Sequence, residues 1–189
     1  MVDFPSKKYQ IIYADPPWQY KDKQNARSRG ASYKYQVQDI EWIKSLPVAD
    51  ISDDNCVLFL WVTFPMLPDA LAVISAWGFK YRTVAFNWVK KNKIKDSWFW
   101  GMGNYTRSNS EVCLLAVKGK NPPKRISNSV HSVVDARIKA HSKKPDEVRD
   151  RIVHLMGDVP RIELFARNHT EGWDVWGNEV ECTAELGSA

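Results

Sequence analysis

Residues 9–18 have the sequence Tyr-Gln-Ile-Ile-Tyr-Ala-Asp-Pro-Pro-Trp. Residues 9–14 form a short apolar run of the kind that favours a strand, and the two prolines end it. We therefore predict a strand over residues 9–14, with Asp15 at its carboxyl end. In open α/β sheets, binding and catalytic side chains gather at the carboxyl ends of strands. Residues 15–18 are therefore the first candidates for a functional site.

The rest of the chain alternates between segments with strand character and segments with helical spacing. Strands are expected over residues 56–62, 79–89, 111–117, 161–165 and 173–176. Helices are expected over 39–45 with Asp39 as the cap, over 67–77 ended by Gly78, and over 145–156 ended by Gly157. Residues 19–36 and 90–110 are expected to be long loops. This alternation predicts an α/β domain with a mostly parallel sheet and helices on both faces.

Composition limits the classes of protein that fit. The chain has 189 residues, of which 44% are hydrophobic and 26% charged, as in one soluble globular domain. We expect this domain over residues 1–180, followed by a C-terminal tail over 181–189. The longest apolar run, 56–62, is far shorter than the roughly 20 residues that span a bilayer. The N-terminus lacks the form of a secretory signal. The three cysteines are widely spaced and predict neither a disulfide framework nor a metal site. We therefore expect the protein in a reducing cytoplasm.

Charge indicates the kind of partner. The 27 Lys and Arg residues exceed the 22 Asp and Glu residues by 5, which permits a polyanionic partner. The two predicted loops combine cations for phosphates with aromatic residues for bases, an arrangement that suits a single-stranded or flipped nucleotide. Their candidate nucleic-acid-binding residues are Lys21, Arg27, Arg29, Tyr35, Lys90, Lys91, Lys93 and Arg107, with Trp98 and Trp100 nearby. The alternative is that both loops are merely solvated and their tryptophans fold inward.

Residues 15–18 suit methyl transfer to an amino group conjugated with an aromatic ring. The Asp15 carboxylate can accept one N–H of that amino group, and the Pro16 carbonyl can accept the other. Trp18 can stack on the base, contributing roughly 1–3 kcal/mol. A base inside a duplex would first have to be flipped out. The alternative is a simple turn, with Trp18 covering the sheet edge.

Four later blocks follow this motif in a fixed order, at residues 111–119, 141–148, 163–167 and 172–178. Their sequences are Glu-Val-Cys-Leu-Leu-Ala-Val-Lys-Gly, His-Ser-Lys-Lys-Pro-Asp-Glu-Val, Glu-Leu-Phe-Ala-Arg and Gly-Trp-Asp-Val-Trp-Gly-Asn. With Asp-Pro-Pro-Trp, they resemble the MT-A70 family of S-adenosyl-L-methionine-dependent adenine N(6)-methyltransferases. The resemblance covers residues 9–178. It implies a Rossmann-like methyltransferase fold in the permuted β-class order, with the catalytic motif first and the donor block last.

The resemblance also assigns roles to residues. It implies that the catalytic residues are Asp15, Pro16, Pro17 and Trp18. It implies that S-adenosyl-L-methionine is bound by Asp15, Lys144, Glu163, Phe165, Arg167, Asn168, His169 and Asn178. Among these, Lys144 would meet the donor's carboxylate, Glu163 the ribose hydroxyls and Asn178 the donor's adenine. Tyr35 resembles the tyrosine that forms a lid over the target base in this family. A Gly-x-Gly-x-x-Gly motif is absent from the sequence, which weakens a nicotinamide-cofactor interpretation.

The function that we expect is methylation of adenine N(6) in nucleic acid. DNA is the expected substrate because the chain resembles phage and bacterial members and lacks a zinc-finger RNA-binding extension. The alternatives are RNA adenine methylation, an inactive family member that serves as a nucleic-acid-binding scaffold, and a basic nucleic-acid-binding module. The last of these leaves the donor block unexplained. The expected setting is the cytoplasm of a bacterial or phage-infected cell, with no membrane partner and a homodimer left open.

Overall fold

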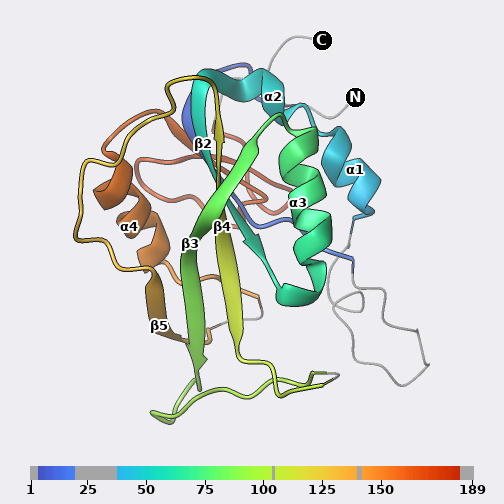
Figure 1. Cartoon of the computed structure of the whole chain (residues 1–189), viewed down its shortest axis with the longest axis vertical. Helices are drawn as coiled ribbons and strands as arrows, with labels where there is room; N and C mark the ends of the chain where they lie inside the picture. Colours follow the sequence, from blue (N-terminus) through green and yellow to red (C-terminus); the bar gives the residue numbers. More distant parts are fainter. Residues whose placement is uncertain (1–3, 20–37, 104, 140–141, 184–189) are drawn as a thin grey trace.

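The computed structural model describes residues 4–19, 38–103, 105–139 and 142–183. Within them, seven strands form one sheet in the order β5-β3-β4-β2-β1-β6-β7 (Figure 1). The strands are β1 (Tyr9–Ala14), β2 (Ser52–Val62), β3 (Lys80–Lys91), β4 (Ser110–Lys118), β5 (Val133–Arg137), β6 (Arg161–Leu164) and β7 (Asp174–Trp176). The helices are α1 (Ile40–Ser45), α2 (Val48–Ile51), the 3₁₀ turn η2 (Phe64–Met66), α3 (Leu67–Ala76) and α4 (Glu147–Met156).

Most strand pairings are parallel, as the alternation of elements predicts. Strand β1 pairs in parallel with β2 and β6, β6 with β7, and β3 with β5. The exceptions are β2 with β4 and β3 with β4, which are antiparallel. Strands β3 and β4 follow each other along the chain, and the described residues between them contain no helix, as is usual for an antiparallel hairpin. The expected α/β class is confirmed, with a mixed sheet.

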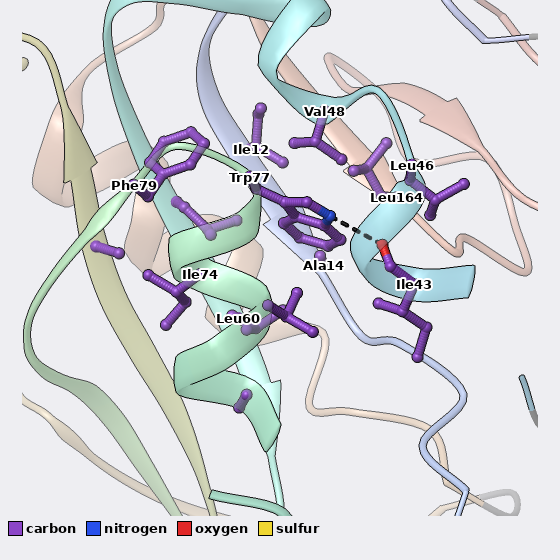
Figure 2. Packing of buried hydrophobic residues seen from close by; sticks show 14 of the residues in the cluster. Ile12, Ala14, Ile43, Leu46, Val48, Leu60, Ile74, Trp77, Phe79 and Leu164 are labelled. Atoms are coloured by element: carbon purple, nitrogen blue, oxygen red, sulfur yellow. Dashed lines mark hydrogen bonds between the residues drawn. The ribbon is translucent and has the colours of Figure 1, made fainter. Parts of the chain in front are cut away.

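Successive side chains of a strand point to opposite faces of the sheet, and in the central strands the side chains on both faces are buried under helices. On one face, Ile12 and Leu58 belong to the core under α1, α2 and α3. On the other face, Ile11 and Phe59 belong to the core under α4. On the first face, Trp77 fills the space between α3 and α1, and its indole N–H donates to the Ile43 carbonyl at 2.9 Å (Figure 2). The prediction of helices on both faces is confirmed.

Two elements lie where short-range sequence patterns predict them. Strand β1 has the predicted bounds, and the Asp39 side chain caps α1 by accepting the Glu41 N–H at 3.2 Å. Strand β5 has no counterpart in the sequence prediction, because its pairing with β3 depends on distant residues and only Val134 is buried in it. In the predicted tail, the Thr183 hydroxyl accepts the Val175 N–H at 2.9 Å, while residues 184–189 lie outside the described ones. None of the helices in the described part of the chain has the length and apolar character needed to cross a membrane.

The sheet order creates a switch point between β1 and β6. From β1 the chain continues to its neighbour β2 on one side, whereas β6 continues to β7 on the other side. Ala14 pairs with Leu164, so the carboxyl ends of β1 and β6 lie side by side. The residues that come next, Asp15 and Phe165, therefore flank the crevice where open α/β sheets bind ligands.

Truncating Trp77 tests the packing of α3 against α1. Trp77 is 1% exposed, and we expect Trp77→Ala to lower the free energy of unfolding by about 3–5 kcal/mol because it leaves a cavity. Trp100 is 55% exposed, and Trp100→Ala should change that free energy by less than about 0.5 kcal/mol. Urea unfolding followed by circular dichroism measures both. Similar losses for the two variants would contradict this account of the core.

Candidate active site

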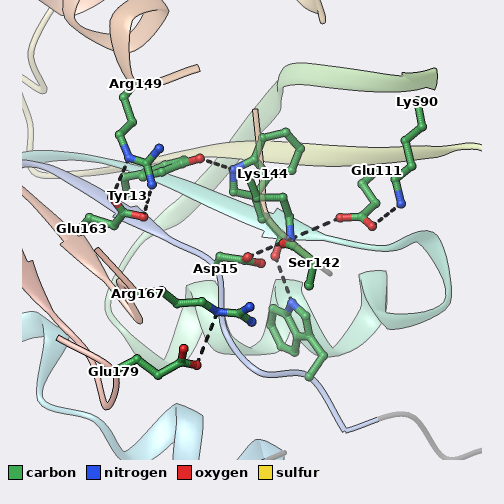
Figure 3. A network of polar contacts seen from close by, with 12 residues as sticks. Tyr13, Asp15, Lys90, Glu111, Ser142, Lys144, Arg149, Glu163, Arg167 and Glu179 are labelled. Carbon is green, nitrogen blue, oxygen red and sulfur yellow. Dashed lines mark hydrogen bonds and ion pairs between the residues drawn. The ribbon is translucent and has the colours of Figure 1, made fainter. Parts of the chain in front are cut away.

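A buried lysine joins the Asp-Pro-Pro-Trp motif to a distant strand (Figure 3). The Nζ of Lys144 lies 2.7 Å from Asp15 Oδ2 and 3.3 Å from Glu111 Oε2. The Lys144 side chain is only 7% exposed, and its ammonium lies 5.8 Å from the centre of the Trp61 ring. Asp15 comes from the end of β1, Glu111 from β4, and Lys144 from the segment before α4. The sheet thus brings together three charged groups that are far apart in sequence.

These three charges shift one another's pKa values. Burial raises the pKa of the Asp15 carboxyl, although Lys144 and Arg167 oppose the rise. Burial disfavours the Lys144 ammonium, but Asp15 and Glu111 outweigh it, so the pKa of Lys144 is raised. Burial also acts against the Glu111 carboxylate, yet Lys144 and Lys90 together lower its pKa. Asp15 is therefore a basic carboxylate beside a firmly protonated lysine.

The rest of the Asp-Pro-Pro-Trp motif forms a tight turn. The Trp18 N–H donates to the Pro16 carbonyl at 2.9 Å, so this carbonyl already accepts one hydrogen bond. The Trp18 indole N–H donates to the Trp61 carbonyl at 3.0 Å, and the side chain belongs to the core under α1 and α3. At 6% exposure, Trp18 covers the end of β2 as the turn interpretation expects. Stacking of Trp18 on a base stays a prediction.

A second buried ion pair lies on the α4 face of the sheet. Arg149 holds both carboxylate oxygens of Glu163, with its Nε and Nη2 each at 2.6 Å (Figure 3). The Arg149 guanidinium also lies 5.6 Å from the centre of the Tyr13 ring. Sequence reasoning singled out Glu163 but missed Arg149, which follows the block at 141–148 by one residue. It also gave no role to Glu111, although an acidic residue at the start of an apolar strand was a usable signal.

The donor-block residues surround the turns after β6 and β7. Phe165 has a φ of 63°, in the left-handed region, and turns the chain directly after β6. The Ala166 N–H donates to the Trp176 carbonyl at 3.0 Å, which ties the two turns together. A Cβ at Gly177 would lie 2.2 Å from the Ala166 carbonyl oxygen, so only glycine fits there. The remaining predicted donor residues are Arg167, 3.6 Å from Glu179, and Asn168, His169 and Asn178, all three exposed.

The predicted nucleic-acid-binding residues have varied surroundings. Lys90 pairs with Glu111 at 2.5 Å, and Lys91 pairs with Asp135 at 2.9 Å. The Arg107 guanidinium donates to two backbone carbonyls of its own loop, and Lys93 is exposed. Phosphate binding by these residues stays a prediction. Four other predicted residues lie outside the described ones: Lys21, Arg27, Arg29 and Tyr35.

Within the described ranges, no group of His, Cys, Asp and Glu side chains is arranged to hold a metal ion. The site is therefore built from two kinds of group. One is a set of paired charges, Asp15, Lys144 and Glu111, and the other is the pair of turns after β6 and β7. The charges can hold and orient polar groups at the crevice. Among the residues of the turns, Arg167 is close enough to Asp15 to act on the pKa of its carboxyl.

Removing Arg149 tests the second ion pair. Its side chain and that of Glu163 are 15% and 8% exposed, so Arg149→Ala leaves a buried, uncompensated carboxylate. We expect the free energy of unfolding to fall by about 3–5 kcal/mol. The control is Lys139→Ala, which breaks a surface pair with Asp146 and should cost about 0–1 kcal/mol. Denaturant titration distinguishes them, and equal effects would show that the Arg149–Glu163 pair is not structurally important.

Comparisons with known proteins point to one family. The MT-A70 family model matches residues 9–179. The type II methyltransferase M.MunI of Mycoplasma sp is 38% identical over 192 residues, covering 93% of this chain and 79% of that protein. The N(6)-adenosine-methyltransferase catalytic subunit METTL3 of Homo sapiens is 29% identical over 177 residues, covering 92% of this chain and 28% of that protein. The N(6)-adenosine-methyltransferase MT-A70-like protein of Drosophila melanogaster is also 29% identical, over 92% of this chain and 27% of its own length.

The chain thus spans most of the bacterial relative but only about a quarter of the two animal proteins. The family match runs from the start of β1 to the turn after β7, so it includes every strand of the sheet and both halves of the crevice. It confirms the resemblance carried by the five sequence blocks. Because it covers nearly the whole chain, the protein belongs to the MT-A70 family of methyltransferases.

Proposed function

We propose that the protein methylates the exocyclic N(6) amino group of adenine in DNA, with S-adenosyl-L-methionine as the methyl donor. The observation that carries this proposal is the Asp15 carboxylate at the switch point, held by the buried Lys144 at 2.7 Å. We favour DNA because the bacterial relative, a type II methyltransferase, is matched over 79% of its length. RNA is the second candidate, because the 29% identical relatives are adenosine methyltransferases. We assign the activity to one domain over residues 1–180, followed by a C-terminal tail.

The residues around the crevice fit this donor chemically. Lys144 is a buried cation that suits a carboxylate, and the donor's carboxylate would join or replace its present partners, Asp15 and Glu111. Glu163 is an acid whose oxygens each accept one hydrogen bond from Arg149 and keep a further lone pair for ribose hydroxyls. Asn178 presents an exposed amide, able to donate and accept, beside a turn that has no room for a side chain at Gly177. S-adenosyl-L-methionine supplies an electrophilic methyl group on a positively charged sulfur. The protein therefore needs to bind, orient and exclude water rather than activate the donor.

Asp15 prepares the nucleophile. The amino nitrogen of adenine is a poor nucleophile because its lone pair is delocalised into the ring. Lys144 holds Oδ2 of Asp15, and we assign Oδ1 to accept one N–H of the target amino group. The Pro16 carbonyl keeps a second lone pair for the other N–H, which favours a tetrahedral nitrogen. As the nitrogen lone pair forms the new C–N bond, the bond from the methyl carbon to sulfur would break and the donor would leave as a neutral thioether. The carboxylate would stabilise the positive charge on this nitrogen, whose proton would then pass to water.

Replacing the Asp15 carboxylate by an amide tests this role. Asp15→Asn keeps the shape but loses the negative charge, and we expect methylation to fall roughly 10²–10³-fold, equivalent to about 2.7–4 kcal/mol of barrier. The melting temperature should change little, because Glu111 still compensates Lys144. The measurement is incorporation of labelled methyl groups into DNA and RNA, followed by identification of the modified nucleoside. Asp54→Asn, an exposed substitution near the amino end of β2, is the matched control and should retain activity.

Equal inactivity of the wild-type protein and Asp15→Asn on all adenine-containing DNA and RNA, with the donor present, would favour the scaffold alternative. Activity on RNA alone would keep the catalytic role of Asp15 and replace the proposed substrate.

Two neighbouring lysines test the donor site. Lys144 is buried, whereas Lys143 is 39% exposed and pairs with Asp146 at 3.1 Å. We expect Lys144→Met to weaken binding of S-adenosyl-L-methionine by calorimetry much more than Lys143→Met does, because only Lys144 faces the crevice. Melting curves of both variants control for folding. If the two substitutions have equal effects, Lys144 does not bind the donor.

A further inference from the structure

The loop between β3 and β4 exposes large apolar side chains. We call residues 92–109 the aromatic loop; residue 104 lies outside the described ones. Trp98 is 44% exposed and Trp100 is 55% exposed. Met102 and Tyr105, at 89% and 101% exposed, lie almost entirely in solvent. Clusters of exposed apolar side chains on a soluble protein usually mark an interaction surface.

The loop holds these side chains on an ordered backbone. Arg107 donates from Nε to the Gly101 carbonyl at 2.9 Å and from Nη2 to the Trp100 carbonyl at 3.0 Å. Asn92 donates from Nδ2 to the Trp98 carbonyl at 3.0 Å. A Cβ at Gly103 would lie 2.0 Å from the Thr106 carbonyl oxygen, so the tip closes tightly. These hydrogen bonds constrain the backbone at Trp98, Trp100 and Gly101, which reduces the conformational entropy lost there when a ligand is bound.

The loop also starts at the edge of the sheet that carries Asp15. Strand β3 is antiparallel to β4, and β4 is antiparallel to β2, which is parallel to β1. The carboxyl ends of β1 and β3 therefore lie at the same edge, and in Figure 1 the loop extends beyond the sheet from the end of β3. A chain of ion pairs, from Asp15 to Lys144 to Glu111 to Lys90, connects the catalytic motif to the base of the loop.

Of the five cations at the base of the loop and within it, three are engaged within the protein. Lys90 and Lys91 pair with Glu111 and Asp135, and Arg107 is bonded to carbonyls. The Lys91 ammonium lies over the Trp98 ring, and its Nζ is 5.6 Å from the centre of that ring. The surface that remains for a ligand is therefore mainly aromatic, with the exposed Lys93 and Lys95 at its side.

We propose that the aromatic loop stacks on the bases next to the target adenine in an unpaired stretch of DNA, rather than clamping phosphates. This inference rests on the proposed function and names the part of the substrate that the loop contacts. Aromatic side chains stack on every base, and an adenine that reaches Asp15 must leave the helix, which exposes its neighbours. A second copy of the chain is the less favourable occupant, because the exposed Lys93 and Lys95 beside the aromatic side chains suit a polyanion better than another chain of net charge +5.

Two strands of equal charge test this inference. One is a short single-stranded DNA of mixed sequence, and the other is an abasic strand with the same number of phosphates. Fluorescence anisotropy at fixed salt measures the affinity for each, with the donor omitted. We expect the wild-type protein to bind the intact strand more tightly, and Trp100→Ala to weaken that binding roughly 5- to 150-fold if one base is stacked. Affinity for the abasic strand should not change.

Matched variants separate stacking from other effects. Trp100→Phe should retain most of the affinity, because it keeps a ring. Tyr81→Ala removes an aromatic residue that is 42% exposed at the opposite end of β3, and should bind like the wild-type protein. The salt dependence of binding should be the same in Trp100→Ala and wild type, because no cation is removed.

Three outcomes would overturn the inference. They are equal binding of both strands by the wild-type protein, equal weakening on both strands by Trp100→Ala, and a change of oligomeric state in Trp100→Ala without a change in DNA binding. The proposed function fails separately. A protein that methylates adenine but is insensitive to Trp100→Ala refutes the loop alone, and one that binds through Trp100 but never methylates refutes the proposed function alone.

Discussion

The buried ammonium of Lys144 is the constraint around which the functional edge of the sheet is built. An unpaired cation at this depth would be strongly destabilising, so carboxylates must meet it. Asp15 and Glu111 do so at 2.7 and 3.3 Å, and they come from β1 and β4, which lie on either side of β2. The pairing thus requires the observed strand order and register. A buried ion pair contributes little net stability, and the aromatic and aliphatic layers on the two faces of the sheet carry the fold.

The same constraint sets the electrostatics of the reaction. Lys144 and Lys90 face Asp15 and Glu111, so formal positive and negative charges balance within this group. In the proposed reaction the target nitrogen becomes cationic when it is methylated, and the Asp15 carboxylate is the charge that we assign to stabilise it. Burial raises the pKa of that carboxyl, which makes it a better hydrogen-bond acceptor than a solvated aspartate. Lys144 keeps it ionised and in place.

Local signals in the sequence were sufficient for the parts of the structure that depend on neighbouring residues. The β1 strand, its Asp-Pro-Pro-Trp turn and the Asp39 cap of α1 are of this kind. The ion pairs are not, since Asp15 and Lys144 are 129 positions apart and their distance depends on the whole sheet. Lys91 shows the same limit. Its partner Asp135 lies on β5, a strand that pairs with β3 and that the sequence prediction lacked, so the ion pair of Lys91 could not be foreseen.

At the edge of the sheet that carries Asp15, charged side chains are buried and aromatic side chains are exposed, which is the reverse of the usual preference of these residue types. Lysine and glutamate are ordinarily solvated, and tryptophan is ordinarily buried. Here Lys144 and Glu163 are 8% and 6% exposed, while Trp100 is 55% exposed. Each reversal carries a free-energy cost that the fold does not require, because the core on both faces is complete without it. Such local conflicts with packing rules are expected where a binding partner supplies the missing surface or charge. Because these conflicts lie near the carboxyl ends of β1, β3 and β6, they support our proposal that the substrate approaches from this edge.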